Sequence, residues 1–195
     1  MTALVWLLIA LPGGVGLMLL AAGRRADRVA GPVAVIVAGV VLAGAVAGVA
    51  GVRTRTELAF FSGAPLSLRI DALAGVVAVT VAAVATVVLV VALREIATGR
   101  WRFYALMLVF LAAVLLTVFA DSMPALLAGW EVMGASSYAL IAFEFRDRAA
   151  VGAGGVAFLT TRTADLGLYL AAGAALAGTA QVPGGTGNRL SLSGL

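Results

Sequence analysis

The chain has no cysteine, no histidine and no lysine among its 195 residues. Iron–sulfur clusters require cysteine thiolates, and haem and zinc sites usually require histidine or cysteine. A Schiff-base lysine is excluded as well. We therefore expect no redox centre, no metal site and no cofactor-binding residue on this chain. Disulfide bonds are also excluded, so cysteine usage says nothing about the cellular compartment.

Charged residues are scarce too, at 11% of the chain, whereas 63% of the residues are hydrophobic and the mean hydropathy is +1.14. A soluble domain of this length has too little interior to bury so much apolar surface. The composition predicts an all-α, polytopic transmembrane helical bundle in a lipid bilayer. All thirteen basic residues are arginines in short clusters between apolar runs, which is typical of membrane loops and does not indicate nucleic-acid binding.

Six apolar runs are long enough to cross a hydrocarbon core of about 30 Å at about 1.5 Å per residue. The predicted spans cover residues 2–22, 29–52, 72–93, 103–120, 124–144 and 150–177. We expect the segment FFSGAPLSLRID, residues 60–71, to form a short hairpin on the outer face. The loops after the first, third and fifth spans carry eight arginines, and the opposite side carries four. The positive-inside rule therefore predicts that both termini lie on the non-cytoplasmic side.

Three ionisable residues lie deep within predicted spans: Glu131, Arg162 and Asp165. A charge at the bilayer centre costs roughly 2.5–3.5 kcal/mol on insertion scales, so we expect these charges to meet. Glu131 and Arg162 are equally far in sequence from the middle of the connection between the last two spans, which predicts similar depths in an antiparallel pair of helices. Asp165 shares a helix face with Arg162. The sequence predicts a carboxylate–guanidinium–carboxylate cluster near the middle of the membrane.

Hydroxyl groups follow Glu131 along its helix, where Ser137 and Tyr138 are expected to support it by binding a carboxylate or a chain of waters. Burial favours the protonated form of a carboxyl group and a nearby arginine favours its ionised form, a balance that a proton carrier requires. The alternative is a static ion pair that specifies helix packing and adds little stability.

Residues near the span ends are interpreted more simply. Asp121 and Glu144 are expected to be water-facing caps. Trp101 and Tyr104 are candidates for interfacial anchors, whereas Trp130 lies too deep for that role.

Two motifs resemble a known family. The segment 129–143 reads GWEVMGASSYALIAF, and TTRTADLG follows at 160–167. They are similar to the patterns G-W-E-x-x-G-x-x-S-Y-x-L-I-x-F and T-R-x-x-D of the antiporter-like subunit L (chain 5) of proton-translocating NADH-quinone oxidoreductase, respiratory complex I. The matching positions are Gly129, Trp130, Glu131, Gly134, Ser137, Tyr138, Leu140, Ile141, Phe143, Thr161, Arg162 and Asp165.

The resemblance covers residues 66–177 well and the first two spans only by topology. It implies that 1–65 holds two N-terminal helices and an outer loop, that 66–177 begins the proton-translocating antiporter-like domain, and that 178–195 is a polar loop or truncated tail. It further implies a translocase subunit in a bacterial plasma membrane, beside other membrane-arm subunits. In the family, the glutamate matching Glu131 is the channel carboxylate, and the residues matching Arg162 and Asp165 belong to its buried network. NADH, flavin, iron–sulfur clusters and quinone would be held by partner subunits.

The chain also departs from the family pattern. The family subunit is much longer, and the lysine that exchanges charge state with the glutamate would lie beyond position 195. A basic residue often found before the T-R-x-x-D element is replaced by Gly155, Val156 and Ala157. We therefore expect a truncated subunit, or a split one in which a separate chain supplies the later helices and the lysine. The alternatives are a subunit of a multisubunit cation/proton antiporter or membrane-bound hydrogenase, or a non-catalytic membrane assembly protein.

Overall fold

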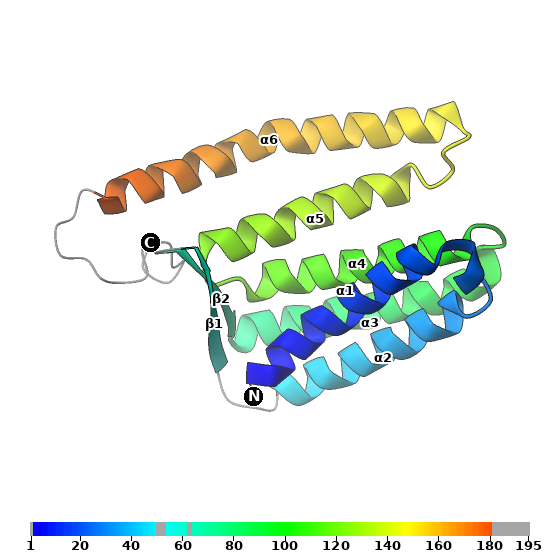
Figure 1. Cartoon of the computed structure of the whole chain (residues 1–195), viewed down its shortest axis with the longest axis horizontal. Helices are drawn as coiled ribbons and strands as arrows, with labels where there is room; N and C mark the ends of the chain where they lie inside the picture. The colour runs from blue at the N-terminus through cyan, green and yellow to red at the C-terminus, as the bar shows by residue number, and fades with distance from the viewer. Residues whose placement is uncertain (1, 50–53, 62–63, 181–195) are drawn as a thin grey trace.

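The computed structural model describes residues 2–49, 54–61 and 64–180. Within them, six long helices form a bundle and a two-stranded sheet lies at one end of it (Figure 1). The elements in chain order are α1 (Thr2–Ala22), the short 3-10 helix η1 (Gly23–Ala26), α2 (Ala30–Val49), β1 (Thr54–Phe61), β2 (Ala64–Ile70), α3 (Ala72–Glu95), α4 (Arg100–Phe119), α5 (Met123–Ile141) and α6 (Arg148–Ala180). The predicted all-α transmembrane bundle is confirmed.

Each of the six predicted spans coincides with one long helix. Within the described residues, α1 to α4 are long and apolar enough to cross a membrane by length and composition. Helices α5 and α6 are not among these, and they carry Glu131, Arg162 and Asp165 together with serines, threonines and glycines. The chain is a multi-pass membrane protein, and the predicted number of six spans is approximate. Residues 181–195 of the predicted tail lie outside the described residues, and Ala180 still belongs to α6.

A hairpin is present as the antiparallel pair β1 and β2, but with Thr54 opposite Ile70 it begins earlier in the chain than the predicted segment 60–71. It is tied to the start of α5, because the Ser67 N–H donates to Ser122 Oγ at 3.0 Å and the Asp121 N–H donates to the Ser67 carbonyl at 2.9 Å. Asp121 is only 1% exposed and lies 3.4 Å from Arg69 Nε. The interpretation of Asp121 as a water-facing cap is therefore wrong, since the hairpin covers it. Glu144, at the other end of α5, is exposed.

Helix α4 lies at the centre of the bundle and buries side chains along much of its length, including Tyr104, Leu108, Leu111, Leu115 and Phe119. Tyr104 is completely buried, so its interpretation as an interfacial anchor is wrong. Helix α1 crosses α4 closely at Gly16, where a Cβ atom would lie 2.9 Å from the Ala105 carbonyl oxygen. Only glycine allows this approach of the two backbones.

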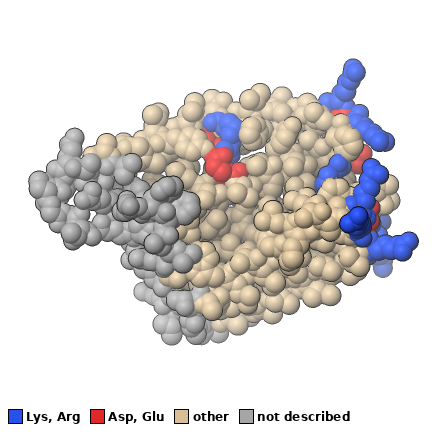
Figure 2. Space-filling view, in the orientation of Figure 1, with Lys and Arg blue, Asp and Glu red and all other residues tan. Residues whose placement is uncertain are grey.

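Charged side chains gather at the end of the bundle opposite the hairpin (Figure 2). This arginine-rich end is formed by η1 with the residues that follow it, the last turn of α3, the start of α4, and the α5–α6 connection with the first residue of α6. Its arginines are Arg24, Arg25, Arg28, Arg94, Arg100, Arg102, Arg146 and Arg148.

Candidate functional site

Helices α5 and α6 are consecutive antiparallel helices joined by the connection 142–147 at the arginine-rich end (Figure 1). Helix α5 begins after Ser122 with Pro124 near its N-terminus, a position that proline favours. Helix α6 begins at Arg148 and stays helical through the glycines that follow. Two regular helices therefore carry Glu131 and Arg162 to similar depths, as the sequence symmetry about the connection predicts.

Arg162 contacts both acidic side chains of the predicted cluster. Its Nη1 atom forms an ion pair across the helices with Glu131 Oε2. Its Nη2 atom lies 3.0 Å from Asp165 Oδ2, one turn further along α6. Figure 2 shows this charged cluster surrounded by uncharged residues, far from the arginine-rich end. The structure thus brings together the three residues that sequence reasoning selected.

Two neighbours on α5 shape the cluster. A Cβ atom on Gly134 would overlap the Arg162 guanidinium, so the absence of a side chain there makes room for the arginine. The Trp130 indole Nε1–H donates to Asp165 Oδ1 at 2.7 Å. Sequence reasoning judged Trp130 too deep for an interfacial anchor but did not give it a partner. The signal was its depth, because a buried indole N–H requires an acceptor.

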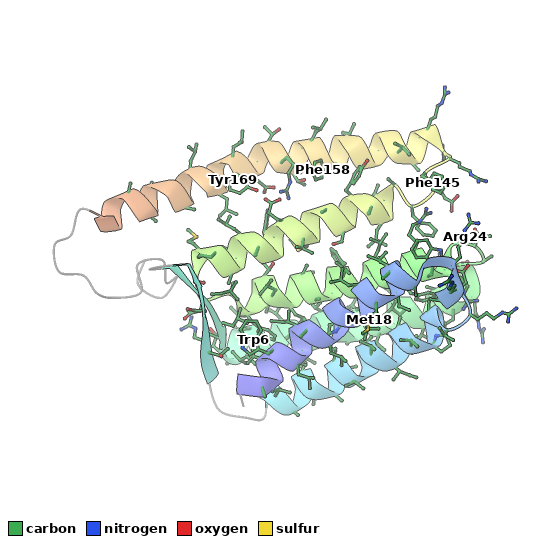
Figure 3. All side chains as sticks on the ribbon, viewed as in Figure 1. Trp6, Met18, Arg24, Phe145, Phe158 and Tyr169 are labelled. Carbon is green, nitrogen blue, oxygen red and sulfur yellow. The ribbon has the colours of Figure 1, made fainter. Side chains whose placement is uncertain are left out.

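Two aromatic residues of α6 complete the surroundings of Arg162. The guanidinium carbon lies 5.3 Å from the centre of the Phe158 ring, and Nη1 lies 3.5 Å from the Tyr169 hydroxyl. Figure 3 shows both side chains on the side of α6 that faces α5. Sequence reasoning missed both residues. Their spacing of four and seven residues from Arg162 places all three on one helix face, and this was the available signal.

A pocket of about 260 Å³ lies beside the cluster, between α4, α5 and α6. It is lined by Phe110, Trp130, Met133, Gly134, Ser137, Tyr138, Ile141, Ala157, Phe158, Thr161 and Arg162. The α5 members follow helical spacing from Trp130 to Ile141, so the pocket extends from the cluster toward the arginine-rich end. Ser137 and Tyr138 line it, but within the described residues neither hydrogen-bonds to Glu131.

The two carboxylates differ in their surroundings. The Asp165 side chain is 5% exposed and has both Arg162 and the Trp130 indole as partners. The Glu131 side chain is 44% exposed and is paired through Oε2 only. Its Oε1 atom is buried with no hydrogen-bond partner among the described residues. Asp165 Oδ2 also lacks a hydrogen bond among the described residues but keeps its ion pair with Arg162, whereas Glu131 Oε1 has neither.

A comparison with protein-family models finds no match for the chain. Subunit L of NADH-quinone oxidoreductase from Mycobacterium tuberculosis (strain ATCC 25618 / H37Rv) is 31% identical over 182 residues, which cover 86% of this chain and 29% of that protein. The chain is a relative of subunit L. Subunit 5 of the chloroplastic NAD(P)H-quinone oxidoreductase of Chlorokybus atmophyticus is 36% identical over 103 residues, covering 52% of this chain and 16% of that subunit.

A third relative is subunit L of the F(420)H(2) dehydrogenase of Methanosarcina mazei, 41% identical over 68 residues that cover 35% of this chain and 10% of that subunit. All three relatives are named as subunits of quinone oxidoreductases or of a dehydrogenase. The chain spans less than a third of the length of the curated relatives it matches.

Solved structures share the fold. The Mrp complex from Dietzia sp. DQ12-45-1b contains a chain that matches with a TM-score of 0.77 at 23% identity, covering 89% of this chain and 19% of that one. The archaeal membrane-bound sulfane sulfur reductase contains a chain that matches with a TM-score of 0.70 at 19% identity, covering 91% and 28%. At these identities the similarity establishes the antiporter-like membrane fold and nothing about activity.

Proposed function

We propose that the chain is a membrane subunit of a proton-translocating NADH-quinone oxidoreductase and that Glu131 is its proton-carrying carboxylate. The single observation that carries this proposal is Arg162 between two carboxylates, midway along two antiparallel helices of a membrane protein. Ionisable groups at such depth are costly and commonly mark ion or proton pathways. The sequence relationship to subunit L supports the choice of complex.

The charge of the cluster explains how it would take up a proton. With both carboxylates ionised, Glu131, Arg162 and Asp165 carry a net charge of −1, which is unfavourable in a low-dielectric environment. One added proton makes the cluster neutral. Because Asp165 has two partners and Glu131 has one, protonation of Glu131 sacrifices fewer interactions. Arg162 then keeps its ion pair with Asp165, so the cluster stays assembled in both charge states.

The pocket beside the cluster would supply the path by which protons reach Glu131. Its volume of about 260 Å³ is enough for a chain of waters, each of which occupies about 30 Å³ in the liquid. The hydroxyls of Ser137, Tyr138 and Thr161 line it and can both donate and accept hydrogen bonds to such waters. The path would open toward the arginine-rich end, which the positive-inside rule assigns to the cytoplasm, with both termini on the opposite side.

The redox chemistry would belong to partner subunits. NADH, flavin, iron–sulfur clusters and quinone would be bound by other chains of the complex, with which this chain would pack in a bacterial plasma membrane. Residues 66–177 would form the first part of the antiporter-like domain. A separate chain, or sequence beyond residue 195, would supply the lysine that receives the charge from Glu131.

A second candidate is a subunit of a cation/proton antiporter or a related membrane-bound complex, which the fold similarity to the Mrp complex favours. The same buried cluster would serve there, since a fold does not determine the transported ion or the energy source. Sodium dependence of transport separates the two. Proton movement driven by NADH oxidation without sodium supports the first proposal.

The decisive experiment is Glu131→Gln in the complete assembly, with NADH-driven proton uptake measured in inverted membrane vesicles. Glutamine keeps the size and the hydrogen bond to Arg162 but cannot carry a proton, so we expect at least a tenfold loss of pumping with normal assembly. The control is Glu95→Gln, which removes one exposed acidic group from the end of α3 and should leave pumping unchanged. Undiminished pumping in a fully assembled Glu131→Gln complex would overturn the proton-carrier role.

A further inference from the structure

The arginine-rich end contains a second pocket, of about 450 Å³, which the proposed proton path does not use. Three arginines line it from three different elements: Arg24 from η1, Arg102 from α4 and Arg146 from the α5–α6 connection. The other lining residues are Asp27, Thr98, Gly99, Trp101, Glu144 and Phe145. Figure 3 shows Arg24 and Phe145 at this same end of the bundle. The pocket therefore carries three positive and two negative side chains.

Contacts within the pocket hold Arg102 in place, while Arg146 lies over the Phe145 ring, with its guanidinium carbon 5.7 Å from the ring centre. Arg102 Nη2 donates to the Phe143 carbonyl at 2.6 Å, and its guanidinium carbon lies 4.6 Å and 4.8 Å from the rings of Phe143 and Phe145. Within the described residues, neither Arg24 nor Arg146 forms an ion pair, and both are exposed. An anion would thus meet a positioned guanidinium flanked by two unpaired ones.

The negative side chains of the pocket do not cancel this preference. Asp27 Oδ1 accepts the Trp101 backbone N–H at 3.0 Å and so caps the first turn of α4. Three arginines and two acidic side chains, Asp27 and Glu144, give the pocket a formal net charge of +1. A single negative charge, as on a phosphodiester, matches that balance.

An apolar groove of about 350 Å³ lies along the same helices, further from the arginine-rich end. It runs between α1, α4 and α5 and is lined by Ile9, Ala10, Gly13, Leu17, Val109, Ala112, Ala113, Leu116 and Val132. Leu17 precedes Arg24 by seven residues, and Val109 follows Arg102 by seven, which is about two helical turns or roughly 10 Å. The groove is thus bordered by α1, α4 and α5, and the basic pocket by the segments that continue them: η1 after α1, the start of α4, and the α5–α6 connection.

From this succession we propose that the basic pocket and the apolar groove together bind one anionic phospholipid. Its headgroup phosphate would lie between Arg24, Arg102 and Arg146, and one acyl chain would lie in the apolar groove. Arginine binds phosphate oxygens through paired N–H groups, and basic pockets between membrane helices suit anionic headgroups. Along α4 the groove begins about 10 Å and ends about 21 Å from Arg102, so only its nearer part lies within a leaflet that is about 15 Å thick. A free phosphate would match the pocket but would leave the groove unused.

The first arm of the test alters the pocket. The full chain is purified from vesicles of equal parts phosphatidylglycerol and phosphatidylcholine, and the retained lipid is measured by native mass spectrometry. We expect retention of phosphatidylglycerol, and about thirtyfold weaker binding in Arg24→Gln/Arg146→Gln, because each basic residue accounts for about a fivefold change. The matched control is Arg25→Gln/Arg148→Gln, two exposed arginines of the same end that do not line the pocket. Equal losses in both pairs, or equal retention of the two lipids, would overturn the proposal.

The second arm alters the groove and separates a lipid from a free anion. Leu17→Trp fills the groove, whereas Met18→Trp adds the same bulk at the next, equally exposed position outside it. We expect loss of long-chain phosphatidylglycerol in the Leu17 variant only. Full competition by inorganic phosphate with no dependence on chain length would show an anion site and refute the lipid site. Circular dichroism checks that each variant folds. If the double variant Arg24→Gln/Arg146→Gln does not fold, the single variant Arg146→Gln in the exposed connection takes its place.

Discussion

Gly134 gives the most direct test of how the buried cluster is built. Its Cα faces the Arg162 guanidinium so closely that a methyl group would overlap the Nη2 atom. The substitution Gly134→Ala adds that methyl group and nothing else. Because the overlapping atoms are the end of a flexible side chain, the helices need not move apart. Instead, Arg162 must leave the position in which it bridges Glu131 and Asp165.

Two effects of opposite sign set the expected change in stability. Alanine favours a helix interior over glycine by about 1 kcal/mol. Breaking a buried ion pair costs about 3–5 kcal/mol, and the lower end applies because the Glu131 side chain is 44% exposed. Gly134→Ala should therefore lower the free energy of unfolding by about 2 kcal/mol on these figures.

The assay is equilibrium unfolding in mixed micelles with increasing dodecyl sulfate, followed by circular dichroism. The matched control is Gly167→Ala in α6, where a Cβ atom would have no neighbour within 4 Å. This control should gain up to about 1 kcal/mol, so the two variants should differ by about 3 kcal/mol. If Gly134→Ala is as stable as Gly167→Ala, Arg162 is not held against Gly134 and the geometry of the cluster is wrong.

Two further substitutions test the packing around the cluster. Trp130→Phe removes the N–H that binds Asp165 and should destabilise the chain by about 1.5–3 kcal/mol in the same unfolding assay; an unchanged unfolding midpoint would contradict that hydrogen bond. Gly129→Ala would place a Cβ atom 2.8 Å from the Thr117 backbone nitrogen, so α4 and α5 must separate, and we expect a loss of about 1–3 kcal/mol. Gly152→Ala, which has no neighbour within 4 Å, is its control and should not lose stability.

The sequence was sufficient for the helices and for the pairing of α5 with α6. Long apolar runs must be helical in a bilayer because every backbone hydrogen bond has to be satisfied within the segment. The short connection 142–147 forces the two helices to be antiparallel neighbours, so the depth of a residue follows from its distance to the connection. For this reason the contact between Glu131 and Arg162 could be anticipated without coordinates. The functional role of that contact stays a prediction.

Contacts between elements that are distant in sequence were not predictable in this way. Asp121 looked like a span end, but its burial depends on β2, which precedes it by about fifty residues and packs over the start of α5. Tyr104 was a candidate for an interfacial anchor because it lies near the end of a predicted span, yet it is completely buried in the bundle. A local pattern shows how deep a residue lies along its helix, but not which side of the helix packs against the other helices.

The packing around α5 also favours one direction of access to Glu131. On the hairpin side, α5 meets α4 backbone to backbone at Gly129, two residues before Glu131, and β2 is hydrogen-bonded to the residues just before α5. On the other side, the pocket continues from the cluster past Tyr138 to Ile141. A proton on the proposed path would therefore enter from the arginine-rich end. Its onward route would lead sideways, past the permanently charged Arg162, toward the exposed face of α6.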